Sequence, residues 1–477
     1  MNRKYIKGIA LLGLIASIML PSCQLVNKYK TPEIDTENMF RDQTSSDTTT
    51  IANIPWRQYF NDPILQGLIE EALTNNFDMQ IAETRIKQAE ASLGMARAAY
   101  FPNVALVGNF DQTRLSANDP LTGAPRDRNS LAYHKESYTL GISASWELDI
   151  WGKINRQHRA SRAQLMATQA GKNLVQTSLI ANIATTYYSL LALDEKMSTT
   201  LAMIELLKES TNTMEKLMQS GSSGITGAAV EQSKAQLYST QVTVNTLKSS
   251  IQELENALST MLGRKPGPIF RSQFTNQQVV TQLNYGVPAQ MLAKRPDVQQ
   301  AELAFRSAFE LKVAAQASFY PQITLTSGLL GYSQTNGLAQ FFKPENLFAS
   351  IVGGLTQPLF AKNQLLGQLK TRKAQEEEAL LTFQKTVLGA SQEVSTILYS
   401  YQQSLAKNET RAKQVESLEK TVDYTQRLLN SGFANSYLEV ITAQQGLLQA
   451  QLDQISDKLE QLQYGVNLYR ALGGGLE

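Results

Sequence analysis

Residues 78–102 (DMQIAETRIKQAEASLGMARAAYFP) and residues 297–321 (DVQQAELAFRSAFELKVAAQASFYP) are two versions of one segment. Aligned without a gap, they share eight of 25 residues, including the first aspartate, an Ala-Glu pair and the closing proline. In both versions two aromatic residues precede that proline. Internal similarity of this kind is the signature of a duplicated supersecondary unit. The chain of 477 residues is therefore predicted to contain two copies of one structural plan.

Within each copy the hydrophobic period changes twice. The segment up to the proline is rich in alanine and predicts a helix, which the proline ends because it lacks an N–H donor and has a fixed φ. Alternation of apolar and polar residues follows, most clearly over 138–148. It predicts strands with one apolar face, of about the 9–11 residues that cross a bilayer. Hairpins are expected at about 102–148 and about 322–357.

After each hairpin, apolar residues recur in steps of three and four. Such series run through 230–261 and 438–469, and the second series includes Gln445. Sustained spacing of this kind predicts paired helices in coiled-coil packing. The run 362–430 would extend about 100 Å at the rise of an α-helix, which is far longer than a helix of a globular protein.

The N-terminus is typical of an export signal. Three basic residues precede an apolar stretch at 8–20, which is shorter than a membrane-spanning helix. Leu20-Pro21-Ser22-Cys23 then resembles the lipobox of bacterial lipoproteins, although Pro21 departs from its usual pattern. The resemblance implies that Cys23 carries lipid and begins the mature chain, and Gln24 after it favours the outer membrane. An ordinary secretory signal is the alternative.

Composition excludes several classes of protein. Hydrophobic residues make up 42% of the chain and charged residues 18%, which excludes a wholly disordered polymer. A net charge of +2 gives no electrostatic reason to expect nucleic acid as a partner. One cysteine and two histidines cannot form the usual metal or thiol-nucleophile sites. We therefore expect a protein without cofactor or metal that is not an enzyme.

Four amphipathic strands are too few to close a barrel, and an open sheet edge in lipid leaves backbone groups unsatisfied. The smallest bacterial barrels have about eight strands. The chain is therefore expected to share a barrel with copies of itself. Two, three or four copies would give eight, twelve or sixteen strands, and the residues alone leave these alternatives open.

Three motifs resemble one family. They are Trp56-Arg57-Gln58-Tyr59-Phe60-Asn61-Asp62-Pro63-Ile64-Leu65, Arg295-Pro296-Asp297-Val298 and the closing Leu472-Gly473-Gly474-Gly475. Together they resemble the NodT/OprM branch of the TolC-like outer-membrane factors. The resemblance implies a mainly α fold with a small β part, in which a homotrimer forms a twelve-strand outer-membrane β-barrel on an α-helical periplasmic barrel.

The same resemblance implies a function. Members are passive exit ducts of tripartite efflux systems in Gram-negative bacteria, with a periplasmic adaptor and an inner-membrane pump, here of the RND type, as partners. Outer-membrane lipid would surround the barrel and hold the anchor. Type I secretion is an alternative use of such a duct. A non-conducting coiled-coil scaffold lipoprotein is an alternative from another class, but it does not explain why both copies interrupt their helices with a hairpin.

Turns between the long helices are expected at about 219–229 and about 429–436. In the family these turns form a closed periplasmic tip that docks on the adaptor. The residues carried over for docking are Ser220, Gly221, Gly224, Ser431, Gly432 and Ser436.

The family often has a Leu-x-x-x-Asp-x-x-Arg pattern at the gate beside the second turn. Here Leu438 matches the leucine, but Thr442 and Gln445 replace the acid and the base. We expect a gate formed by Tyr437, Leu438, Thr442 and Gln445 that closes by packing and hydrogen bonds. Its opening should depend little on salt or mild acidification. The alternative is that Leu438 is an ordinary residue of the helical seam.

The expected organisation follows from these boundaries. It comprises a signal peptide at 1–22, a lipidated arm at 23–55, repeat 1 at 56–263, a linker at 264–290, repeat 2 at 291–473 and a tail at 474–477.

Overall fold

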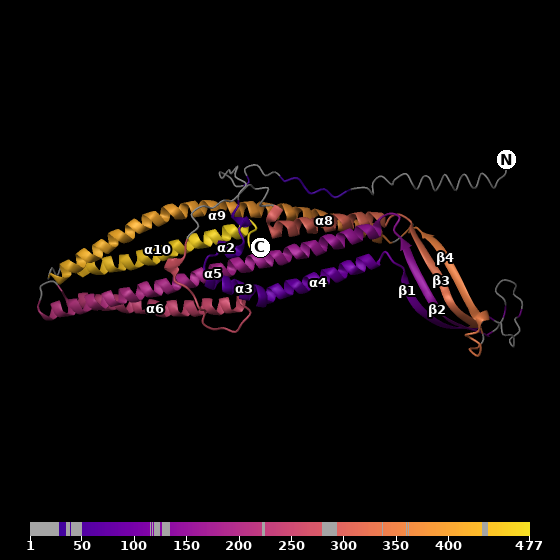
Figure 1. Cartoon of the computed structure of the whole chain (residues 1–477), viewed down its shortest axis with the longest axis horizontal. Coiled ribbons are helices and arrows are strands. Elements are labelled where there is room, and N and C mark those ends of the chain that lie inside the picture. The colour runs from indigo at the N-terminus through magenta and orange to yellow at the C-terminus, as the bar shows by residue number, and fades with distance from the viewer. Residues whose placement is uncertain are drawn as a thin grey trace. The chain divides into compact units, whose positions relative to one another are not determined.

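A computed structural model of the chain describes residues 28–34, 39, 50–114, 116, 118, 125, 134–221, 225–278, 293–335, 337–358, 360, 362–431 and 437–477. The fold is mainly helical with one small sheet, as the sequence predicts (Figure 1). The elements are η2 (Ile51–Asn53), α2 (Trp56–Tyr59), α3 (Pro63–Asn75), α4 (Phe77–Ala98), β1 (Asn103–Arg114), β2 (His134–Leu148), α5 (Lys153–Gln219), α6 (Gly227–Met261), η3 (Phe274–Asn276), α8 (Pro296–Ala317), β3 (Gln322–Thr335), η4 (Pro344–Asn346), β4 (Leu347–Thr356), α9 (Gln364–Asn430) and α10 (Tyr437–Ala471).

The duplication predicted from the sequence is present element by element. Helices α4 and α8 each have 22 residues, α5 and α9 each have 67, and α6 and α10 each have 35. The expected long helix at 362–430 is α9. Among the described residues, no helix is both long and apolar enough to cross a bilayer.

Contacts between residues divide the chain into two compact units, and each unit contains parts of both repeats. The sheet unit comprises the described residues of Met1–Pro32, Lys87–Ala167 and Glu302–Thr382. The helical unit comprises those of Glu33–Ile86, Thr168–Ala301 and Phe383–Glu477. The repeats of the sequence are therefore not the compact units of the structure.

In the sheet unit the four strands form an antiparallel meander in the order β1-β2-β3-β4 (Figure 1). Repeat 1 and repeat 2 meet at the β2–β3 pair, where Gly141 lies opposite Gly331. A Cβ atom on Gly331 would overlap the Leu140 carbonyl oxygen and the Gly141 Cα atom. The two glycines therefore allow a close approach between β2 and β3.

Large apolar side chains of the sheet remain exposed. They lie on all four strands, and β1 and β4 are the edges of the sheet. The most exposed on one face are Val104, Leu106, Phe110, Ile142, Leu330, Leu347, Ile351 and Leu355, and Val352 is exposed on the other face. An apolar sheet face of this extent is expected where another surface covers it.

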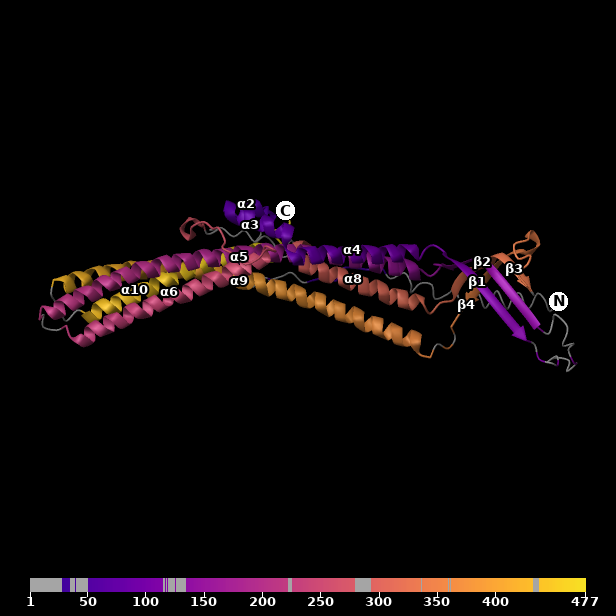
Figure 2. The same ribbon diagram turned by 90° about the horizontal axis from the view of Figure 1, so that it is seen from below.

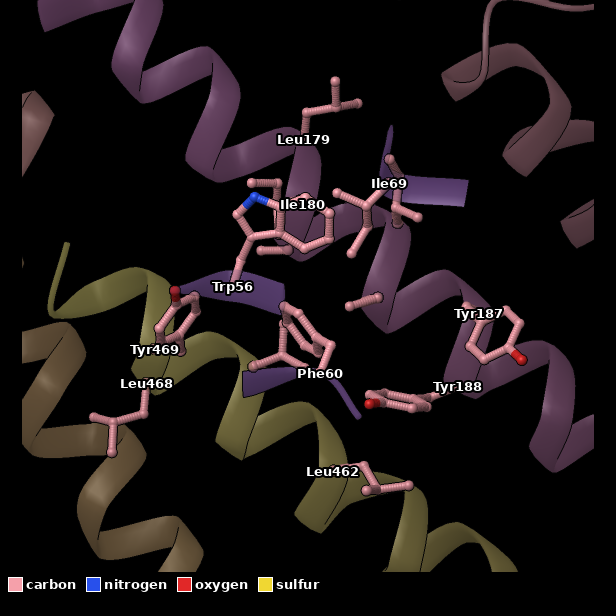
Figure 3. Close-up of a cluster of buried hydrophobic side chains, with 14 of the residues drawn as sticks. Trp56, Phe60, Ile69, Leu179, Ile180, Tyr187, Tyr188, Leu462, Leu468 and Tyr469 are labelled. Carbon is pink, nitrogen blue, oxygen red and sulfur yellow. The ribbon is translucent and has the colours of Figure 1, made fainter. Parts of the chain in front are cut away.

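The helical unit has the opposite character, because its apolar side chains are buried. Trp56 and Phe60 insert between α5 and α10, near Ile180 and Tyr469 (Figure 3). The rings of Tyr59 and Tyr469 are stacked with their centroids 4.2 Å apart. The family-like motif at 56–65 thus forms part of the core of this unit.

A buried polar network closes the same core. Asp62 caps α3 by accepting from the Ile64 N–H at 2.9 Å, and its other carboxylate oxygen accepts from the Tyr187 hydroxyl at 2.9 Å. Gln277 donates to the same oxygen at 2.8 Å. Burial alone would raise the pKa of Asp62, but the hydrogen bonds from Ser272, Tyr187, Ile64 and Gln277 outweigh it and lower the pKa.

Each repeat ends with the same backbone motif. In repeat 1 the Gly263 N–H donates to Thr260 O and the Arg264 N–H to Ser259 O. In repeat 2 the Gly473 N–H donates to Arg470 O and the Gly474 N–H to Tyr469 O. Both are Schellman caps, and φ is +71° at Gly263 and +89° at Gly473. The duplicated Leu-Gly pair is therefore a helix-stop signal.

A polar side chain ties the beginning of each repeat to its end. Asn76 Nδ2 donates to Met261 O at 2.8 Å, and Arg295 Nη1 donates to Ala471 O at 2.7 Å. Met261 and Ala471 are the last residues of α6 and α10, whose terminal carbonyls lack a partner within the helix. Equivalent positions of the two copies thus perform the same task with different residues.

The segments beyond the repeats also contact the helical unit. Ile51 of the expected arm and Phe274 of the expected linker are each 4% exposed. At the C-terminus the Trp56 N–H donates to Glu477 O at 3.2 Å, which holds the last residue against α2.

Candidate gate at the tips of the helix hairpins

Two helix hairpins, α5–α6 and α9–α10, run side by side in the helical unit, and their turns lie together at one end (Figure 2). The first turn begins at Ser220 and Gly221, where φ of Gly221 is +72°. The second begins at Ser431. The docking residues Gly224, Gly432 and Ser436 lie outside the described residues.

The two serines that were expected at the docking turns are occupied by their own helices. Ser220 Oγ donates to Leu217 O at 2.9 Å, and Ser431 Oγ donates to Arg427 O at 2.9 Å. Each hydroxyl thus satisfies a carbonyl in the last turn of a helix. On the other side of the first turn, Thr226 Oγ1 accepts from the Ala229 N–H and caps α6.

An apolar cluster holds the four helices together next to the turns. This tip cluster consists of Met214, Ile225, Ala229, Val230, Leu429, Val440 and Ile441. Tyr437, the first residue of α10, is partly buried against it. Tyr437 therefore packs within its own chain.

The other three gate residues lie on a different face of α10. Leu438, Thr442 and Gln445 follow at helical spacing and are all exposed, Leu438 by 51%. Val440 and Ile441, and not Leu438, form the buried seam within this chain. The apolar series predicted Gln445 in the seam as well, but the neighbouring Gln444 is buried there, 1% exposed.

Neutral hydrogen bonds surround this exposed face. Thr442 Oγ1 donates to Leu438 O at 2.8 Å, and Gln445 Nε2 donates to Gln236 Oε1 of α6. Lys234 of α6 is paired within its own hairpin. Lys234 is 2.9 Å from Glu215 and 3.1 Å from Glu231, and hydrogen bonds from these carboxylates raise the pKa of Lys234.

A polar layer crosses the bundle directly behind the tip cluster. We define it by Ser210 and Thr211 of α5, Ser233 of α6, Gln426 of α9 and Gln444 of α10. Gln444 Nε2 donates to Ser210 Oγ at 2.7 Å, and Gln426 Oε1 lies 3.1 Å from the same oxygen. Thr211 and Ser233 are hydrogen-bonded at 2.7 Å. Each of the four helices contributes to this layer.

The polar layer separates two apolar regions and is incompletely satisfied. Beyond it lies a second cluster, which includes Met203, Leu207 and Leu447. Gln444 Oε1 and Gln426 Nε2 are buried and have no hydrogen-bond partner among the described residues. A buried polar atom without a partner costs about 1–3 kcal/mol. Sequence reasoning missed this layer, although Ser233 within the apolar series of α6 was a sign of it.

An ion-pair cluster joins α9 to α10 farther along the bundle. Asp457 is 3% exposed and lies 2.6 Å from Lys407 Nζ and 3.0 Å from Arg411 Nε. Burial alone would raise the pKa of Asp457, but hydrogen bonds from Lys407 and Arg411 outweigh it and lower the pKa. In the described part of the chain, no group of three or more His, Cys, Asp or Glu side chains is arranged to hold a metal ion. Cys23, the expected lipidation residue, lies outside the described residues.

A duplicated set of long helices, a meander sheet with an exposed apolar face and paired helix hairpins define the class of TolC-like outer-membrane channels. The model of the family described as outer membrane efflux protein matches residues 68–264 and 287–474. The chain belongs to this family, whose members are outer-membrane efflux components.

Individual proteins agree with this assignment. The toluene efflux pump outer membrane protein TtgC of Pseudomonas putida is 28% identical over 480 residues, which cover 97% of this chain and 94% of that protein. The probable outer membrane lipoprotein SilC of Salmonella typhimurium is 26% identical over 472 residues, with 98% of each chain covered. The structure of the outer-membrane channel OprN superimposes with a TM-score of 0.84 at 24% identity, over 94% of this chain and 98% of that chain. That similarity shows a shared fold.

Proposed function

We propose that the protein is the outer-membrane channel of a tripartite efflux system and works as a homotrimer. The observation that carries this proposal is the sheet. Its edge strands β1 and β4 each pair on one side only among the described residues, and its apolar side chains are exposed. Three copies would join these edges into a barrel of twelve strands, in which lipid covers the apolar side chains.

We infer that the duct is passive and not an enzyme, so an inner-membrane pump supplies the energy. A periplasmic adaptor and an RND-type pump are the partners that fit this role. The name of TtgC, a toluene efflux pump outer membrane protein, favours efflux over type I secretion. Docking of the adaptor at the turns would use backbone groups and the accepting lone pairs of Ser220 and Ser431, because these hydroxyls already donate their protons to their own helices.

We propose that the exposed stripe of Leu438, Thr442 and Gln445 lines the gate and that Tyr437 sets its position. The duplication supports this assignment. Residues 437 and 438, which open α10, correspond to Gly227 and Ala228 of α6, so the bulky pair is present only in repeat 2. Three copies of Leu438 would meet in a closed trimer as an apolar ring.

We also propose that Cys23 carries lipid and anchors the chain in the outer membrane. The description of SilC as an outer membrane lipoprotein supports this proposal. Mass spectrometry of the N-terminal peptide should show Cys23 as the first residue with acyl groups attached. A mature chain that begins at another residue, or an unmodified Cys23, would contradict it.

Planar-bilayer conductance of the purified protein tests the duct and its gate together. Wild type should give small or flickering currents, and a Tyr437→Gly, Leu438→Ala variant, which copies the tip of repeat 1, should give larger steady steps. Tyr437→Gly alone tests packing against the tip cluster, because Leu438 is unchanged.

A matched control lies on α9. Tyr424 and Leu428 are an exposed tyrosine and leucine close to the same tip, 61% and 42% exposed. Changing them to glycine and alanine should leave the currents near those of wild type. Large equal currents from wild type and the gate variant would keep the duct but place its constriction elsewhere. An oligomer that never conducts would instead indicate a scaffold.

A further inference from the structure

The N-terminal arm is held by one face of α8 in the sheet unit. The Tyr29 ring lies between Phe305 and Phe309, with centroid distances of 5.8 Å and 5.7 Å. Arg306 Cζ lies 5.5 Å from the same ring. The Tyr29 hydroxyl points to Glu302 Oε1 at 3.5 Å. Residues 302, 305, 306 and 309 follow at i, i+3, i+4 and i+7, so they share one face of the helix.

A second contact fixes the direction of the arm. Thr31 Oγ1 donates to Glu302 Oε1 at 2.8 Å. Burial and the Glu302 carboxylate raise the pKa of Tyr29 to about 12, so the phenol stays neutral and remains a donor. Lys28 and Lys30, which flank Tyr29, are exposed. The arm thus inserts one aromatic side chain and leaves its charged neighbours in solvent.

The duplication provides an internal comparison for this face. The residues of α4 that correspond to 302, 305, 306 and 309 are Glu83, Ile86, Lys87 and Glu90. The acid and the base are kept, but both phenylalanines are absent. Glu83 instead pairs with Lys172 of α5 at 2.8 Å. Only α8 therefore offers an aromatic site for Tyr29.

We propose that Glu302, Phe305, Arg306 and Phe309 form a docking site for the N-terminal arm that sets how far the lipid anchor can lie from the sheet. The inference rests on the acylation of Cys23 in the proposed function. Six residues lead from Cys23 to Tyr29, and six extended residues span at most about 20–22 Å.

The distance along α8 matches this reach. From Phe305 to Ala317, the last residue of α8, twelve helical steps extend about 18 Å. A short connection then leads to Gln322, the first residue of β3 (Figure 1). The acyl chains on Cys23 can therefore reach the level at which β3 begins, but little farther. The anchor is confined to the membrane surface next to the helical ends of the strands.

The rate of trypsin cleavage after Lys28 and Lys30 measures docking directly, because these lysines flank Tyr29. Cleavage there should be slow in the intact full-length protein in detergent. Tyr29→Ala should speed it about tenfold, equivalent to about 1.4 kcal/mol, whereas Tyr29→Phe should change it less because the ring contacts remain. Phe309→Glu, which copies Glu90 of α4, should act like Tyr29→Ala. The matched control is Glu90→Phe, which should have no effect.

Arm length tests the reach of the anchor. Deleting residues 25–27 leaves a tether of about 10 Å, which is shorter than the distance along α8. In isolated outer membranes this variant should be cleaved about tenfold faster than wild type at Lys28 and Lys30. After extraction into detergent, where the acyl chains move freely, its protection should return. An insertion of three residues should keep protection in both conditions.

Two results would overturn the inference. One is equal cleavage of Tyr29→Ala and wild type in detergent, which would show that Tyr29 does not hold the arm. The other is full protection of the shortened arm in membranes with Cys23 shown to be acylated, which would show that arm length does not limit the position of the anchor. Neither result depends on conductance, so a failure of the duct proposal would be seen separately.

Discussion

The three long helices of repeat 1 match those of repeat 2 in length, but the two repeats differ in chemistry at the arm-docking face and at the proposed gate. Helices α4 and α8, the two long helices and the two terminal helices match in their number of residues. Repeat 1 has Asn76, Ile86, Glu90 and Gly227 at the positions where repeat 2 has Arg295, Phe305, Phe309 and Tyr437.

This difference shows how a duplicated scaffold acquires separate tasks. The positions that set geometry, such as the Leu-Gly helix stops, are the same in both copies. The positions that contact the arm or line the tip differ. Arm docking and the proposed gate therefore both belong to repeat 2. Variants at equivalent positions of the two repeats measure this asymmetry.

The largest effect is expected at Arg295. Its guanidinium contacts Asp297 at 2.7 Å, Glu393 at 2.9 Å and Ala471 O at 2.7 Å. Arg295→Ala removes the cation beside Asp297 and Ala471 O in a largely buried place, while Glu393 keeps its ion pair with Arg470, and it should lower the free energy of unfolding by about 3 kcal/mol. Denaturant unfolding in detergent, followed by helical circular dichroism, measures this change.

Asn76→Ala is the matched variant in repeat 1. It removes a neutral hydrogen bond to Met261 O and the cap of α4, so the loss should be about 1–2 kcal/mol. Equal losses at the two positions would show that the charge of Arg295 contributes nothing beyond its hydrogen bond.

The junction of the repeats should be the next most sensitive place. Gly331→Ala forces β2 and β3 apart at this close contact, with an expected cost of about 2 kcal/mol and less assembled oligomer on native gels. Gly353→Ala on β4 is the control, since a Cβ atom there meets nothing within 4 Å. Normal assembly of both variants would contradict the close approach of the two glycines.

The stability that Arg295 contributes through Asp297 should depend on pH. Burial would raise the pKa of Asp297, but the Arg295 hydrogen bond and charge outweigh it and lower the pKa below the ordinary value. Its contribution is then fully present above about pH 4, the pKa in the unfolded chain, and is lost as the pH falls through the folded pKa. The difference in unfolding free energy between wild type and Arg295→Asn should therefore shrink on acidification. A difference that grows as the pH falls would reverse the assigned shift.

The smallest effect is expected at the gate. Thr442→Asp with Gln445→Arg introduces exposed charges where the chain has neutral residues, and each exposed ion pair contributes about 0.2–1 kcal/mol. Wild-type opening should depend little on ionic strength, whereas the variant should open more readily as salt rises. Bilayer conductance at low and high salt measures both. A steep salt dependence in wild type would show that charges elsewhere hold the tip closed.

Much of the fold could be predicted because it rests on local patterns. Proline after an aromatic pair ends α4 and α8, and the Leu-Gly pairs end α6 and α10. Steps of three and four predicted the long helices. The same pattern misplaced Gln445 in the seam of α10, because the buried face there passes through Ala443, Gln444 and Leu447 and leaves Gln445 exposed.

The candidate sites were less accessible to sequence reasoning. Exposure of Leu438 depends on which face of α10 the tip cluster takes, and the family pattern identified the residue without its environment. The polar layer was missed because Ser210 lies 216 residues from Gln426 and 234 residues from Gln444. Nothing local marks such residues as partners.

The sequence by itself determined the duplication, the helices and strands, their stops and the mainly helical class, since propensity, periodicity and backbone restriction act over a few residues. Only the tertiary structure decided how the copies interleave into two units, that Arg295 and Asn76 do equivalent work, and that Tyr29 docks on α8 and not on α4. These outcomes depend on contacts between segments tens to hundreds of residues apart. Their free energy comes from burial and hydrogen bonding that exist only after the chain has folded.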